Sequence, residues 1–186
     1  MNVIIRQLLF ALLFILTTTA SLANALPATG TVEVFFSPIG GATDAIITEI
    51  NHAKNEILIQ AYSFTSAPIA KALLDAHKRG VRVEAVLDKS QRSERYTSAT
   101  FLLNAGIPVT IDDRHAIAHN KILVIDRQIL ITGSFNFTKA AEERNAENLL
   151  ILKGNKPLID QYFQNFEENK SHSVEYEFQP KTKKRR

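Results

Sequence analysis

The sequence contains no cysteine, no internal repeat and no linker rich in proline, glycine or serine. Without cysteine the chain can form no disulfide, no thiolate metal site and no thiol nucleophile. Without a linker or a repeat, the chain after its first 25 residues has the length of one compact domain. These absences direct attention to histidine, lysine and carboxylate chemistry.

A long apolar run is also missing. The stretch from Leu8 to Leu16 has nine residues, whereas a membrane span needs about 20. It follows Arg6 and precedes the small residues Ala23-Asn24-Ala25, a pattern typical of a signal peptide. We therefore expect residues 1–25 to be a cleaved signal peptide and the protein to be periplasmic or secreted, with an uncleaved anchor as the alternative. No stable membrane association is expected of the mature domain, residues 26–180.

Positive charge is concentrated rather than general. The 22 basic and 19 acidic residues give a net charge of +3, and loss of Arg6 with the signal peptide leaves +2. The tail at residues 181–186, KTKKRR, carries five positive charges, so the rest of the mature chain is at −3. A sequence pI near 9.2 therefore does not by itself define a nucleic-acid binder. A local cluster of Lys89, Arg92 and Arg95 follows a predicted strand and is expected either to contact a substrate backbone or to be a solvated loop.

Strand and helix patterns alternate along the chain. Strands are expected at residues 31–36, 56–62, 81–88, 108–112, 121–126, 129–134 and 149–153. Helices are expected around residues 46–53, 67–79, 97–104, 138–144 and 157–169. This alternation predicts the α/β class, with helices on both faces of a central sheet. The strands at 121–126 and 129–134 are too close for a helical crossover, so they should pair as a hairpin in a mixed sheet, with the turn at residues 126–128.

Two short motifs place polar groups at a spacing of two residues. HNKILVID contains His119 and Lys121, and GSFNF contains Ser134 and Asn136. Side chains two apart on a strand share a face, so the hairpin should bring the two pairs together. An imidazole, an ammonium group and neutral donors are the groups that phosphodiester chemistry requires.

HNKILVID has the form H-x-K-x4-D, and with the following G-S-x-N it resembles the phospholipase D superfamily. The resemblance extends over residues 31–170. Within the superfamily, the chain resembles the small bacterial endonucleases of the EDTA-resistant type, which carry one motif per chain. It implies a cofactor-free reaction through a phosphohistidine, at a site where two H-x-K-x4-D motifs face each other. The only other H-x-K, His52-Ala53-Lys54, has Ile59 in place of the aspartate. The resemblance therefore implies a homodimer that shares its site.

The resemblance also assigns roles. His119 of one chain attacks phosphorus while the partner's His119 protonates the leaving oxygen, which predicts a bell-shaped pH–rate profile. Lys121, Asn136 and Ser134 hold the phosphate oxygens, and Glu147 orients the imidazole. Asp126 either shares that orienting role or braces the hairpin turn.

Three functions fit these residues. The first is a metal-independent, sequence-nonspecific endonuclease acting on DNA and possibly RNA. The second is a phospholipase D-type lipid phosphodiesterase, and the third is a catalytically inert nucleic-acid-binding protein. A metal cluster of Asp112, Asp113, His115 and His119 is considered and not expected, because no helix aligns His115 with His119 and no supporting shell is evident.

Overall fold

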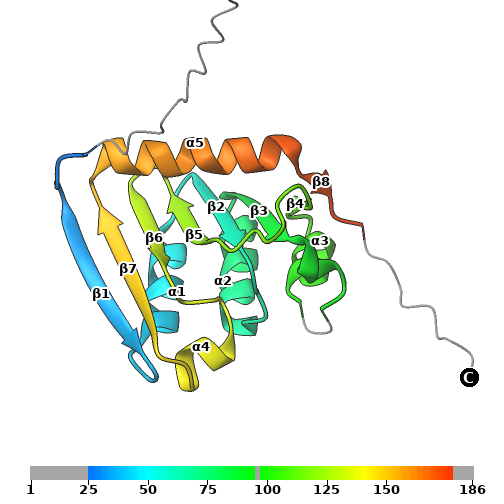
Figure 1. The fold of residues 1–186 in the computed structure, drawn as a ribbon, viewed down its shortest axis with the longest axis horizontal. Helices are drawn as coiled ribbons and strands as arrows, with labels where there is room; N and C mark the ends of the chain where they lie inside the picture. Colours follow the sequence, from blue (N-terminus) through cyan, green and yellow to red (C-terminus); the bar gives the residue numbers. More distant parts are fainter. Residues whose placement is uncertain (1–24, 95–96, 178–186) are drawn as a thin grey trace, which may run out of the picture.

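The computed structural model describes residues 25–94 and 97–177 of the chain (Figure 1). The predicted signal peptide apart from Ala25, the loop residue Arg95 and the basic tail at residues 181–186 lie outside the described residues. No helix in the described part is both long and apolar enough to cross a bilayer.

The described residues form one mixed sheet of eight strands in the order β1-β7-β6-β5-β2-β3-β4-β8. The strands are β1 (Thr31–Ser37), β2 (Glu56–Ala61), β3 (Arg82–Asp88), β4 (Val109–Asp112), β5 (Lys121–Ile125), β6 (Ile129–Gly133), β7 (Glu147–Lys153) and β8 (Val174–Glu175). The β2–β3 and β3–β4 pairs are parallel and the others antiparallel. The predicted mixed sheet and the β5–β6 hairpin are confirmed.

Helices cover both faces of this sheet (Figure 1). They are α1 (Ala42–His52), α2 (Ala67–Lys78), α3 (Ala99–Asn104), α4 (Lys139–Glu143) and α5 (Lys156–His172), with the 3-10 turn η1 (Lys89–Arg92). The helix α1 and its neighbour α2 pack on one face through residues such as Ile46 and Leu73. On the opposite face α5 contributes Ile159 and Phe166, which lie against Val124 of β5. The sandwich predicted from the alternation is therefore present.

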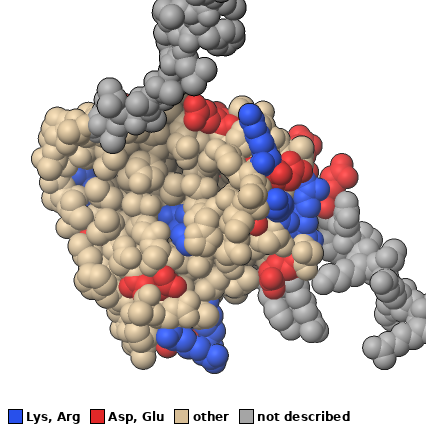
Figure 2. Space-filling view, in the orientation of Figure 1, with Lys and Arg blue, Asp and Glu red and all other residues tan. Residues whose placement is uncertain are grey.

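The apolar content of each strand follows its place in the sheet. All six residues of β2 are buried, because helices cover both of its faces. At the edge, β1 differs: Val32, Val34 and Phe36 are exposed, with Phe36 at 67%. Val32 and Val34 lie beside Leu152 and Leu150 of β7, and Phe36 lies beside Asn148, on the face that α5 covers only in part. Figure 2 shows this face as a broad area with few charged groups. The face of β1 that carries Val32, Val34 and Phe36 is therefore an exposed apolar surface.

Two small elements escaped the sequence prediction. The turn η1 has four residues and β8 has two, which is too short for a hydrophobic period to appear. The strand β8 pairs with β4, which places the end of α5 beside the last residue of β4.

Candidate active site

His119 and Lys121 lie at the start of β5, a central strand of the sheet. Lys121 is the first residue of that strand, and its Nζ donates a hydrogen bond of 3.0 Å to the carbonyl oxygen of His119. His119 precedes the strand and is exposed, whereas Lys121 is 6% exposed. The expectation that both lie within the strand is correct for Lys121 and wrong for His119. The result is a reachable imidazole beside a buried ammonium group.

Tyr62 joins these two residues and was not identified from the sequence. Its ring centroid lies 4.5 Å from that of His119, and Lys121 Nζ lies 5.1 Å from the Tyr62 centroid. Tyr62 follows β2 directly, and its backbone N–H donates to the carbonyl of Asn120. A cation within about 6 Å of an aromatic ring is attracted to it. Tyr62 therefore positions both motif residues.

Burial lowers the pKa of Lys121 below its ordinary value, because the charged ammonium loses water. The negative charge of Glu147 opposes this shift, which places Glu147 within electrostatic reach of Lys121. A protonated lysine held in a partly dry site interacts strongly with an anion. A phosphate oxygen is the kind of group that this arrangement can bind.

The G-S-x-N motif starts where β6 ends, at Gly133. The backbone there has φ 150, and a Cβ atom at this position would lie 2.2 Å from the carbonyl oxygen of Asn148. Only glycine fits, and the same Asn148 oxygen accepts the N–H groups of Ser134 and Phe135. The expectation that Ser134 and Asn136 lie within this strand is therefore wrong. Both residues follow it, in a turn that the glycine permits.

Ser134 and Glu147 form a hydrogen-bonded pair. Ser134 Oγ donates to Glu147 Oε2 at 2.6 Å, and Asn145 Nδ2 donates to Glu147 Oε1 at 2.9 Å. Ser134 Oγ also accepts the N–H of Asn148. The carboxylate of Glu147 is thus held by Ser134 and Asn145, and the electrostatic effect on Lys121 ties this pair to the other motif. Orientation of His119 by Glu147 stays a prediction.

Asn136 brings an unused polar group. Its Oδ1 position is buried and has no hydrogen-bond partner among the described residues. The next residue, Phe137, forms a β-bridge with Phe64, which places Asn136 beside the segment that follows Tyr62. The carboxamide of Asn136 therefore has an oxygen that no described residue uses, and contact of this side chain with a phosphate oxygen stays a prediction.

Asp126 lies at the other end of β5 from His119, and its proposed orienting role is corrected. Its carboxylate accepts the backbone N–H groups of Lys54, Asn55 and Glu56 at 2.7 to 2.9 Å. Both Asp126 and Arg127 have positive φ, as a two-residue hairpin turn requires. Arg127 pairs with Glu56 and lies 3.5 Å from the Phe163 ring centroid. These contacts hold a turn that lacks glycine, so Asp126 is a structural residue.

The variant Asp126→Ala is expected to lower the free energy of unfolding by about 3 kcal/mol, because three backbone donors lose a charged acceptor. Urea denaturation followed by circular dichroism measures this change. Asp160→Ala, which removes an exposed pair with Lys156, is the matched control and should shift stability by less than about 1 kcal/mol. The rate per folded molecule should stay unchanged. A folded Asp126→Ala protein without activity would restore the orienting role.

The predicted basic loop is folded against the chain that leads to His119. Lys89 donates to the carbonyl of His115 at 3.0 Å, and Arg92 pairs with Asp113 at 3.1 Å. Arg95 lies outside the described residues. Lys89 and Arg92 therefore brace the β4–β5 connection, and their contact with substrate stays a prediction.

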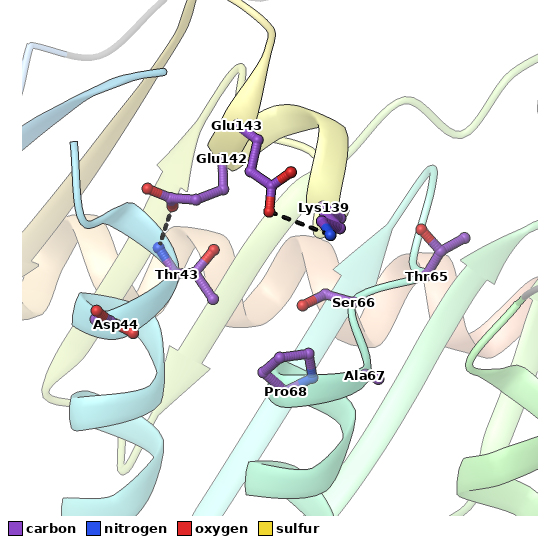
Figure 3. A pocket seen from close by; sticks show the side chains of 9 residues that line it. All are labelled: Thr43, Asp44, Thr65, Ser66, Ala67, Pro68, Lys139, Glu142 and Glu143. Carbon is purple, nitrogen blue, oxygen red and sulfur yellow. Dashed lines mark hydrogen bonds and ion pairs between the residues drawn. The ribbon is translucent and has the colours of Figure 1, made fainter. Parts of the chain in front are cut away.

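A cavity of about 470 Å³ lies beside α4 rather than at His119. Figure 3 shows its lining from the starts of α1 and α2 and from α4. Glu142 of α4 accepts the N–H groups of Gly41 and Thr43, and Lys139 pairs with Glu143. These charges satisfy one another and the start of α1. We interpret the cavity as a junction between helices.

The fold and the paired motifs define a phosphodiesterase of the phospholipase D superfamily. Residues 46–170 match the family described as "Cardiolipin synthase, PLD-like domain", and the chain belongs to this family. The resemblance seen in the motifs is thus confirmed.

Particular relatives agree with this assignment. The chain is 43% identical to a protein named phospholipase D from Rickettsia felis, over 73% of this chain and 67% of the relative. It is 33% identical to mouse mitochondrial cardiolipin hydrolase, over 54% of this chain and 46% of the relative. Among solved structures, the phospholipase D family member Nuc from Salmonella typhimurium is similar, with a TM-score of 0.76 and 36% identity over 80% of this chain and 99% of Nuc.

Proposed function

We propose that this protein is a sequence-nonspecific endonuclease that hydrolyses the phosphodiester bonds of DNA, and also of RNA, without a metal ion in the reaction. The observation that carries the proposal is the exposed imidazole of His119 at the end of the sheet where the central strand β5 begins, beside buried Lys121. A long polymer can present a phosphodiester to this end of the sheet without entering a cavity. The likeness to Nuc over nearly the whole of that chain supports this choice.

The active form that we propose is a homodimer. One chain supplies one His119, whereas the reaction needs a nucleophile and a separate proton donor. The uncovered face of β1, with Val32, Val34 and Phe36, is an apolar surface that a second copy can bury. A twofold axis beside the start of β5 would bring the two imidazoles to one phosphate.

The reaction then has two balanced steps. The neutral ring of one His119 attacks phosphorus, and the P–O bond to the leaving nucleotide breaks as the partner's His119 delivers its proton to that oxygen. The second ring, now neutral, takes a proton from water, and the resulting hydroxide displaces the first His119 from phosphorus. Lys121 and Asn136 bind the nonbridging oxygens, whose negative charge they stabilise. Ser134 donates its one hydroxyl proton to Glu147, so it serves first to hold that carboxylate, and its own contact with the phosphate stays a prediction.

A substrate panel tests this function. Purified mature protein is incubated in excess EDTA with plasmid DNA, single-stranded DNA, RNA and phosphatidylcholine or cardiolipin vesicles in separate reactions. We expect nicking and then degradation of the nucleic acids and no release of lipid headgroups. Hydrolysis of lipid alone would establish the function that the names of several relatives carry, phospholipase D and cardiolipin hydrolase. Binding of DNA without cleavage would favour the inert binding protein.

A further inference from the structure

A second cluster of ligating side chains lies apart from His119. Among the described residues, Asp112, His115 and His172 each direct one ligating atom into the same small space, and the three atoms lie within 4.8 Å of one another. They come from the end of β4, from the connection to β5 and from the last residue of α5. We propose that these three residues bind a divalent transition-metal ion of the zinc type, and that this ion is structural rather than catalytic.

The distances fit the size of such an ion. Asp112 Oδ2 lies 2.7 Å from His115 Nδ1 and 3.5 Å from His172 Nε2. In a tetrahedral zinc site, with ligands about 2.0 to 2.1 Å from the metal, neighbouring ligand atoms are about 3.3 Å apart. The third distance, between the two imidazole nitrogens, is at most 4.8 Å. A rotation of the exposed His115 ring away from Asp112 and toward His172 would bring all three distances close to that spacing. Two imidazoles and one carboxylate form a common zinc ligand set, with water as the fourth ligand.

The orientation of the cluster is already fixed. Asp112 is fully buried, and its other oxygen, Oδ1, accepts the backbone N–H of His115 at 3.2 Å. This contact aims Oδ2 at the two rings, as a supporting hydrogen bond does for metal-bound carboxylates.

His172 supplies an independent observation. Its Nε2 atom is buried, faces Asp112 and has no hydrogen-bond partner among the described residues. A buried ring nitrogen without a partner is costly for the folded state. A cavity of about 410 Å³ opens onto both imidazoles. An ion can therefore enter from solvent and satisfy the unpartnered nitrogen.

Such an ion would join three parts of the fold. It would tie α5 to the end of β4 and hold the connection that runs from His115 to His119. The same connection is already held by Ala118, whose N–H donates to Asp88 Oδ2 at 2.7 Å. The ion would not contact the reacting phosphate, so removal of metal should reduce stability and leave the reaction chemistry in place. The metal cluster considered from the sequence ended with His119 and did not include His172. The pairing of β4 with β8 brings His172 into position.

The test uses tag-free full mature protein, stripped with EDTA and dialysed. Titration with Zn²⁺ by calorimetry should give one site per chain, saturating Zn²⁺ should raise the melting temperature, and Co²⁺ should give the visible spectrum of a low-symmetry, four-coordinate ion. His172→Gln, which keeps the shape and polarity of the side chain, should weaken Zn²⁺ binding at least about tenfold and abolish the thermal shift. His52→Ala removes an exposed histidine at the end of α1 and is the matched control.

Each outcome decides the proposal. Zn²⁺ binding that is weakened by His172→Gln and His115→Ala but not by His52→Ala supports it, provided that circular dichroism shows the variants to be folded. Absence of Zn²⁺ binding, or equal binding by wild type and the folded His172→Gln variant, overturns it. In that case the three residues form only a hydrogen-bonded junction.

Discussion

The variant His119→Ala is expected to lose all measurable phosphodiester hydrolysis, a decrease of about 10⁴-fold or more. The imidazole acts both as nucleophile and, in the partner, as general acid, and loss of general acid–base action alone costs about 10² to 10⁴. Initial rates on plasmid DNA in EDTA measure the effect. His52→Ala is the control, because His52 also precedes a lysine by two residues but ends α1 without an aspartate partner. Substantial residual activity of folded His119→Ala would reject the histidine mechanism.

Mixing the two proteins tests whether the site is shared. Wild type and His119→Ala are unfolded together, refolded at equal amounts and compared with refolded wild type at the same total concentration. If every site needs two imidazoles, only dimers with two wild-type chains are active, and the rate should fall to about one quarter. A rate of one half would mean that each chain works alone. Trapping of phosphorus on the ring of His119 would independently identify the nucleophile.

The sheet was largely predictable because its strands are apolar runs bounded by clear breaks. The β2 and β5 segments, EILIQA and KILVI, are buried throughout, so their composition reflects burial on both faces. The hairpin turn was predicted from its position, but its geometry was not. Asp126 and Arg127 adopt positive φ there because Lys54, Asn55, Glu56 and Phe163 hold them, and such contacts leave no local sequence signal.

The site residues within the two sequence motifs were predictable. The residues that only tertiary contacts bring to a site were not. The spacing of His119 to Lys121 and of Ser134 to Asn136 indicated a shared patch, although three of these residues lie just outside the strands. Tyr62 could have been found only from the β2–β5 pairing, which places it beside Asn120. His172 likewise joins Asp112 through a two-residue strand. Long-range pairings of this kind decide which distant residues meet.

The second prediction with a large expected effect concerns Lys121. Its ammonium group is proposed to bind the phosphate oxygens, but burial of this charge lowers the stability of the fold. The variant Lys121→Met should lower kcat by about 10² to 10³, since a positioned donor to the charged phosphate oxygens is lost. The same variant should be no less stable than wild type, because methionine fills the space without a buried charge. Chemical denaturation and initial rates on the same preparations measure both effects. Lys71→Met, at an exposed position on α2 paired with Asp75, is the control and should keep full activity.

The pH dependence of this comparison follows from the lowered pKa of Lys121. In the folded protein the ammonium releases its proton at a lower pH than in the unfolded chain, so in the alkaline range the unfolded chain binds more protons. The free energy of unfolding of wild type should therefore rise, relative to Lys121→Met, as the pH increases through the folded pKa of Lys121 toward that of an ordinary lysine. Over the same range the rate should fall, because the neutral amine no longer stabilises the phosphate oxygens. A wild-type rate that stays constant while the stability difference narrows would show that Lys121 serves packing rather than the reaction.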